Sequence, residues 1–105
     1  MSQKEKLKHY SFLVYGLGST GRSVIKYFKK NNISKYFVWD DKLKLRKKFK
    51  KKRILNLNET LKKVDFIVLS PGISLRNAKN KKQLIKYKEK IITDIDLLYL
   101  SGKKF

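Results

Sequence analysis

The sequence predicts one α/β domain over residues 1–105: a Rossmann-like, doubly wound, mainly parallel sheet of five strands with helices on both faces. A chain of 105 residues has the length of a single domain. Its 41% hydrophobic and 12% aromatic content can build a packed core, which excludes a disordered chain. Short apolar runs rich in β-branched and aromatic residues alternate with longer segments of helical period, as in parallel α/β sheets.

Five short apolar runs predict the strands, because each is rich in Val, Ile, Phe, Tyr or Trp. Strands that are buried on both faces and separated by helices form parallel sheets with right-handed crossovers. The predicted strands are residues 11–15, 36–39, 54–55, 66–69 and 91–92, of which 54–55 has the weakest pattern.

Apolar stripes at helical spacing predict the helices between these strands. Asn58 ahead of residues 59–63, and Thr93 with Asp96 three residues later, are typical of helix starts, because a side-chain oxygen there accepts from a free backbone N–H. The stripes are Val24 with Ile25 and Phe28, Leu45 with Phe49, and Leu84 with Tyr87.

The composition excludes several classes of protein. The chain has no cysteine, which rules out disulfides, thiolate metal sites and cysteine nucleophiles, and its single histidine rules out a multi-histidine metal centre. No stretch approaches the roughly 20 apolar residues of a membrane span. We therefore expect a cytoplasmic protein without a membrane partner.

The 28 Lys and Arg residues against 8 Asp and Glu give a net charge of +20, which attracts polyanions. Residues 42–53 hold nine basic residues in twelve, and as a helix they would bury Leu45 and Phe49 and expose a cationic stripe. Non-specific polyanion binding is one interpretation of this stripe. A solvated helix face is the other, since lysine-rich composition is also what an AT-rich coding sequence produces.

The sequence GLGSTG at residues 16–21 leaves the first predicted strand and opens the first helix. In such a turn Gly16 permits the tight bend, Gly18 lets an anionic ligand approach the backbone, and Gly21 lets helix and strand pack closely. The helix N-terminus adds free N–H groups and a partial positive charge. This context predicts a phosphate-binding loop.

A pair of acids, Asp40 and Asp41, ends the second predicted strand about 20 residues after the loop. Folds of this kind place a carboxylate there for a hydroxyl or the base of a nucleoside. The register of strand, loop, helix, strand and acid therefore predicts nucleotide binding. The alternative is a tight turn with Asp40 as a solvated strand end.

The same loop nearly matches the triphosphate-binding pattern GxxxxGK[ST], but Arg22 stands where that pattern has lysine. A forked guanidinium is a poor substitute for a lysine point charge on the outer phosphates. Asp65 begins its predicted strand instead of ending it, so no magnesium-binding acid follows a later strand. A triphosphate loop is therefore the weaker interpretation.

The strand at residues 66–69 stops abruptly at Ser70, Pro71 and Gly72. Open α/β sheets bind ligands at this carboxyl edge, where the backbone N–H groups of Gly72 and Ile73 could face a ligand. A plain Pro-Gly turn explains the same residues.

Taken together, four ordered motifs resemble the N-terminal domain of the Mur ligase family, in particular of the ligase that adds D-glutamate to UDP-N-acetylmuramoyl-L-alanine in peptidoglycan synthesis. The sister ligase that adds L-alanine has a different first loop and SSA in place of SPG. The matching motifs are residues 14–23, 38–42, 65–73 and 92–98.

The resemblance implies that this domain holds the UDP part of the substrate and contains no catalytic residue. Asp40 matches the acid that accepts from the uracil N–H, and Gly72 matches a backbone contact. The substrate-binding residues that the family implies are Gly16, Gly18, Ser19, Thr20, Gly21, Asp40, Asp41, Lys42 and Gly72.

By the same resemblance, the ATP loop, magnesium and D-glutamate domain of the ligase would lie beyond Phe105. We therefore expect the 105-residue chain to be a monomer that holds no cofactor or metal and is inactive alone. Two other functions remain open from the residues. One is an NAD-binding domain of an oxidoreductase or regulatory module, in which Asp40 and Asp41 would repel a 2′-phosphate. The other is a non-specific nucleic-acid-binding module.

Overall fold

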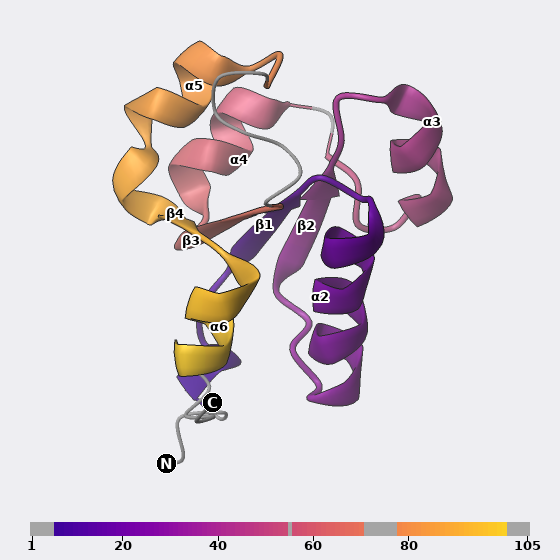
Figure 1. Cartoon of the computed structure of the whole chain (residues 1–105), viewed down its shortest axis with the longest axis vertical. Coiled ribbons are helices and arrows are strands. Elements are labelled where there is room, and N and C mark those ends of the chain that lie inside the picture. Colours follow the sequence, from indigo (N-terminus) through magenta and orange to yellow (C-terminus); the bar gives the residue numbers. More distant parts are fainter. Residues whose placement is uncertain (1–5, 55, 71–77, 101–105) are drawn as a thin grey trace.

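The computed structural model describes residues 6–54, 56–70 and 78–100, which form one layered α/β unit (Figure 1). No helix in these ranges is long and apolar enough to cross a membrane. The elements are β1 (Phe12–Tyr15), α2 (Ser19–Lys30), β2 (Tyr36–Trp39), α3 (Leu43–Arg46), η1 (Lys47–Phe49), α4 (Leu57–Lys63), β3 (Phe66–Leu69), α5 (Lys81–Lys86), η2 (Lys88–Lys90), β4 (Ile91–Ile92) and α6 (Asp94–Leu100).

The four strands form one parallel sheet in the order β2-β1-β3-β4. Tyr15, the last residue of the central strand β1, pairs with Trp39 of β2 and with Leu69 of β3. Because all strands run the same way and stay in register, β1, β2 and β3 end at one edge. The predicted parallel α/β class is confirmed, and these four strands lie where the sequence predicts them.

The predicted fifth strand is not confirmed. Arg53 makes only an isolated parallel bridge with Val38 of β2, Ile54 lies in no strand, and Leu55 lies outside the described residues. The chain touches the edge of β2 at this one point because it must turn at once into α4, whose N-cap is Asn56. The described sheet therefore has four strands, and the Rossmann-like wrapping stays a prediction.

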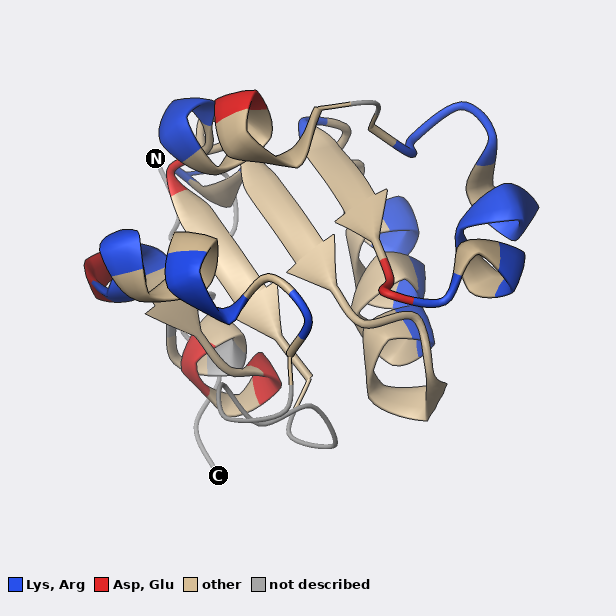
Figure 2. Ribbon diagram, turned by 90° about the horizontal axis from the view of Figure 1, so that it is seen from above, with Lys and Arg blue, Asp and Glu red and all other residues tan. Residues whose placement is uncertain are grey.

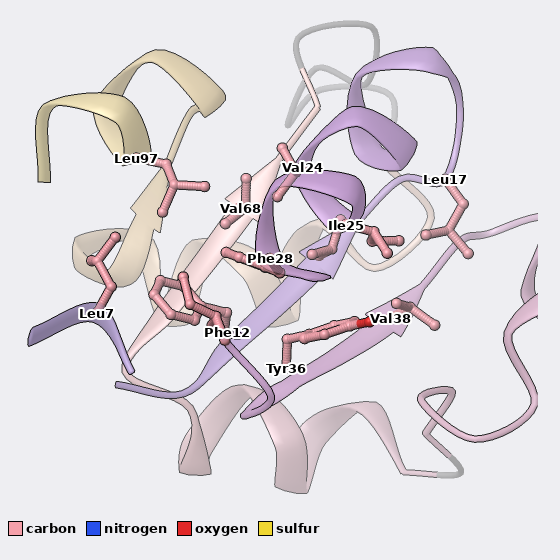
Figure 3. Packing of buried hydrophobic residues seen from close by; sticks show 12 residues of the cluster. Leu7, Phe12, Leu17, Val24, Ile25, Phe28, Tyr36, Val38, Val68 and Leu97 are labelled. Atoms are coloured by element: carbon pink, nitrogen blue, oxygen red, sulfur yellow. The ribbon is translucent and has the colours of Figure 1, made fainter. Parts of the chain in front are cut away.

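Two hydrophobic clusters cover the two faces of the sheet, because successive side chains of β1 point to opposite sides. Phe12 and Val14 pack with residues of α2 and α6, whereas Leu13 and Tyr15 pack with residues of α4 and α5. Figure 3 shows the first cluster, in which the rings of Phe12 and Phe28 lie 4.9 Å apart between their centroids. Helices thus lie on both faces, as predicted.

The two predicted helix starts have different outcomes. Thr93 and Asp96 form a reciprocal capping box: Thr93 N–H donates to Asp96 Oδ2 at 3.0 Å, and Asp96 N–H donates to Thr93 Oγ1 at 3.2 Å. The start predicted at Asn58 is wrong, because Asn56 caps α4 and its Oδ1 accepts from Glu59 N–H at 3.0 Å. A cap two residues earlier lets Leu57 reach the core, where it is buried.

The capping geometry predicts different effects for two similar substitutions. Asn56→Ala removes the acceptor for Glu59 N–H, so the free energy of unfolding should fall by about 1 kcal/mol. Asn58→Ala changes an exposed position inside the helix and should leave stability unchanged or slightly higher. Urea denaturation of both variants measures this, and a larger loss for Asn58→Ala would contradict the assignment of the cap.

Candidate functional site

Three residues meet where β1, β2 and β3 end: Gly16, Asp40 and Ser70. The Gly16 N–H donates to Trp39 O at 2.7 Å, and the Ser70 N–H donates to Tyr15 O at 3.2 Å. The buried Ser70 hydroxyl donates to Gly16 O at 3.3 Å. The carboxyl edge of the sheet is thereby fixed by hydrogen bonds between all three strand ends.

The loop after β1 needs glycine at two positions for structural reasons. Gly16 has a φ of 106°, in the left-handed region that favours glycine. At Gly21 an added Cβ would lie 1.8 Å from Gly16 O, so only glycine lets α2 approach the loop this closely. At Gly18, by contrast, an added Cβ would meet no atom within 4 Å. Space beside Gly18 is therefore open, and the approach of an anionic ligand there stays a prediction.

Asp40 is 5% exposed and ties the phosphate-binding loop to the segment after β2. Its Oδ2 accepts from Leu17 N–H at 2.7 Å, and its Oδ1 accepts from Lys42 N–H at 2.8 Å. A carboxylate oxygen can accept more than one hydrogen bond, so Asp40 retains capacity for a ligand donor. The residue is a structural anchor at the position predicted for base recognition.

A cavity of about 370 Å³ opens at this edge of the sheet, beside the N-terminus of α2. The first turn of α2 contains no acidic residue, and its N-cap Gly18 offers no side chain as an acceptor for the free N–H groups. Those groups, the helix dipole and Lys42 together favour an anionic ligand. The cavity is lined by Gly18, Ser19, Thr20, Asp40, Lys42, Leu45 and Ser70.

The structure brings together five of the predicted site residues and leaves others apart from the cavity wall. Gly16 and Gly21 do not line the cavity, but their close approach sets the position of the loop beside it. Gly72 lies outside the described residues. Leu45 and Ser70 also line the cavity, but the sequence did not predict them as site residues. Leu45 belongs to a predicted helical stripe, and Ser70 follows a predicted strand.

Asp41 does not line the cavity but binds a polar network on the opposite face of the sheet. Its Oδ1 accepts from the Tyr15 hydroxyl, from Trp39 Nε1 at 3.3 Å and from Asn80 Nδ2 at 3.1 Å. Its Oδ2 accepts from Lys79 N–H at 3.0 Å. Asp41 thus anchors the start of α5 to the ends of β1 and β2, instead of facing the loop with Asp40.

This network shifts the pKa values of Asp41 and Tyr15. Burial opposes ionisation of Asp41, but the hydrogen bonds donated by Tyr15, Lys79, Trp39 and Asn80 outweigh it and hold its pKa below the ordinary value. Burial, together with the bond to Asp41, raises the pKa of Tyr15 to about 12. The Tyr15 hydroxyl therefore stays a proton donor to a charged carboxylate across the neutral range.

The cavity wall carries the groups of a candidate binding site. It offers N–H donors, hydroxyl groups, one lysine and one hydrogen-bonded carboxylate. Within residues 6–54, 56–70 and 78–100, no three His, Cys, Asp or Glu side chains gather as metal ligands. Such a wall can hold a phosphate group and orient an attached polar ring.

The Tyr15 network predicts a distinct pH dependence of stability. Tyr15 ionises near pH 10 in an unfolded chain and near pH 12 in the folded one, so the free energy of unfolding falls as pH rises through this window. Tyr15→Phe removes this contribution, so its stability deficit relative to wild type, about 1–2 kcal/mol at neutral pH, should shrink above pH 10. Urea unfolding from pH 7 upward measures both proteins.

Tyr10→Phe is the matched control, because Tyr10 is 40% exposed and lies outside the network. It removes a tyrosine hydroxyl without touching the network, so a change with pH that only Tyr15→Phe shows is assigned to the network. A constant deficit for Tyr15→Phe over the same range would contradict the network.

The family model for "Mur ligase MurD-like, N-terminal domain" matches residues 10–93, which include β1, the glycine loop, Asp40 and β3. A search of curated proteins gives no match to this chain. Since the family model covers most of the 105 residues, the chain belongs to the Mur ligases, ligases of peptidoglycan synthesis, as a MurD-like N-terminal domain.

Proposed function

We propose that this domain binds UDP-N-acetylmuramoyl-L-alanine for a cytoplasmic ligase that adds D-glutamate to it. The observation that carries the proposal is the cavity at the carboxyl edge of the sheet, bounded by the N-terminus of α2 and by Asp40. Membership of the Mur ligase family supports a substrate from peptidoglycan synthesis.

The diphosphate of the substrate would lie against the first turn of α2. Gly18, Ser19 and Thr20 line the cavity there, and open space beside Gly18 lets phosphate oxygens approach the backbone N–H groups. Lys42 adds a positive charge on the same wall. Helix N–H groups and a lysine together complement the two negative charges of a diphosphate.

The uracil ring would lie at the Asp40 end of the cavity. The unused lone pairs of the Asp40 carboxylate can accept from the uracil N–H, while Leu45 offers an apolar surface to the ring. Because Asp40 is already held by Leu17 and Lys42 N–H groups, its orientation is fixed before the ligand arrives. A preorganised acceptor loses little entropy on binding.

The contribution of the domain to catalysis would be position. Adding D-glutamate through an acyl phosphate requires ATP, magnesium and groups that stabilise the transferring phosphoryl, which we assign to other domains of the ligase. Holding the substrate at its UDP end places the far carboxylate in reach of that chemistry. Such positioning lowers the activation barrier by several kcal/mol, because the reactants lose their translational and rotational freedom before the reaction.

Two glycine substitutions test the site, since one should change the affinity for UDP and the other the stability of the fold. Gly18→Ala places a methyl group in open space beside the cavity, so the fold should remain stable while the Kd for UDP rises about tenfold or more, roughly 1.4 kcal/mol. Gly21→Ala forces a Cβ onto Gly16 O and should lower the free energy of unfolding by about 3 kcal/mol. Titration calorimetry and urea denaturation measure the two effects.

A lysine pair supplies the charge control. Lys42 lines the cavity and Lys44 does not, although both are exposed in the same basic segment. Lys42→Ala should weaken UDP binding severalfold, and Lys44→Ala should leave it within error. Tight binding of NAD with none of UDP would favour the dinucleotide interpretation and contradict the proposal.

A further inference from the structure

A second hollow, of about 380 Å³, lies away from the nucleotide cavity and is walled by lysines. Its lining consists of Lys29 at the end of α2, Tyr36 at the start of β2, and residues 47–52. The two cavities share no lining residue. Because α2 runs from Ser19 at one cavity to Lys29 at the other, about 15 Å of helix separates them.

The hollow is lined largely by residues 47–52, which belong to a strongly basic segment of the sequence. Residues 42–53 hold nine basic side chains and no acid, and Figure 2 shows them as blue stretches interrupted by tan beyond the β2 edge of the sheet. The exposed lysines around the hollow include Lys47, Lys48, Lys50 and Lys51. At this density the lysines repel one another, so a bound polyanion relieves the repulsion.

Two other cations of the segment are held in place by the fold. Lys52 donates to Ser34 O at 2.7 Å, and its Nζ lies 4.5 Å from the centre of the Tyr36 ring. The guanidinium carbon of Arg46 lies 3.9 Å from the centre of the Trp39 ring. These contacts anchor the basic segment on β2, so the exposed lysines extend from a fixed backbone.

We infer that this lysine hollow binds the phosphodiester backbone of a nucleic acid strand. Lysines from two segments surround a concave surface, which suits an extended polyanion better than the flat face of a membrane. The lining holds two aromatic residues: Tyr36 is only 4% exposed and Phe49 is half-buried, so they offer little ring surface on which bases could stack, and such stacking does not depend on base sequence. The hollow therefore recognises phosphates and not base sequence, and RNA and DNA present the same chemistry to it.

The test compares two variants of the 105-residue chain that lose the same charge in different places. Binding of short single-stranded RNA and DNA of mixed sequence is followed by fluorescence anisotropy over a range of salt concentrations. The hollow variant carries Lys47→Gln, Lys48→Gln, Lys50→Gln and Lys51→Gln. The control variant carries Lys81→Gln, Lys82→Gln, Lys86→Gln and Lys88→Gln, at exposed positions of α5 and η2.

The hollow variant should bind both strands at least tenfold more weakly at physiological salt. The slope of log affinity against log salt should become shallower by about 3, since each lost phosphate contact contributes roughly 0.7 for single strands. The control variant should stay within about threefold of wild type, because its lysines lie away from the hollow. A saturating excess of UDP should not displace the strand, because the two cavities are separate.

Three results would overturn the inference. Equal losses in both variants would mean that net charge, and not the hollow, attracts the strand. Binding to vesicles rich in phosphatidylserine without binding to either oligonucleotide would assign the surface to membranes. A preference for one base sequence that survives at physiological salt would show base recognition, which a lining of lysines and two mostly covered aromatic rings does not support.

Discussion

The in-register parallel pairing of β1 with β2 and β3 ends three strands at one edge of the sheet. Gly16, Asp40 and Ser70 follow these strands directly, so a constraint on backbone pairing brings together residues more than 50 positions apart in sequence. The close approach of Gly21 to Gly16 then sets α2 against the same edge. The cavity is the space that these two constraints leave open.

The two neighbouring carboxylates at the end of β2 bind different parts of the chain. Asp40 holds the loop before α2 and the segment before α3, whereas Asp41 holds Tyr15 and the start of α5 on the other face. Each acid thereby fixes one side of the sheet edge. Both faces of the edge are therefore tied by hydrogen bonds to the same strand end.

Local patterns predicted much of this fold. Short β-branched and aromatic runs located the strands, and the glycine loop located the start of α2, because these signals lie within a few residues of each other. The role of Asp41 could not be predicted, since its partners Tyr15 and Asn80 lie 26 and 39 residues away. The predicted fifth strand is not confirmed for a similar reason. Whether Ile54 pairs with β2 depends on how soon the chain must enter α4, which no local pattern states.

The proposed function requires a UDP moiety in the cavity between the N-terminus of α2 and Asp40. Backbone amide NMR during titration with UDP tests it most directly, since each N–H reports on its own surroundings. The largest shift changes should fall on Gly18, Ser19, Thr20 and Lys42, with little change at residues 47–52. Changes confined to residues 47–52, with the loop unaffected, would contradict the claim.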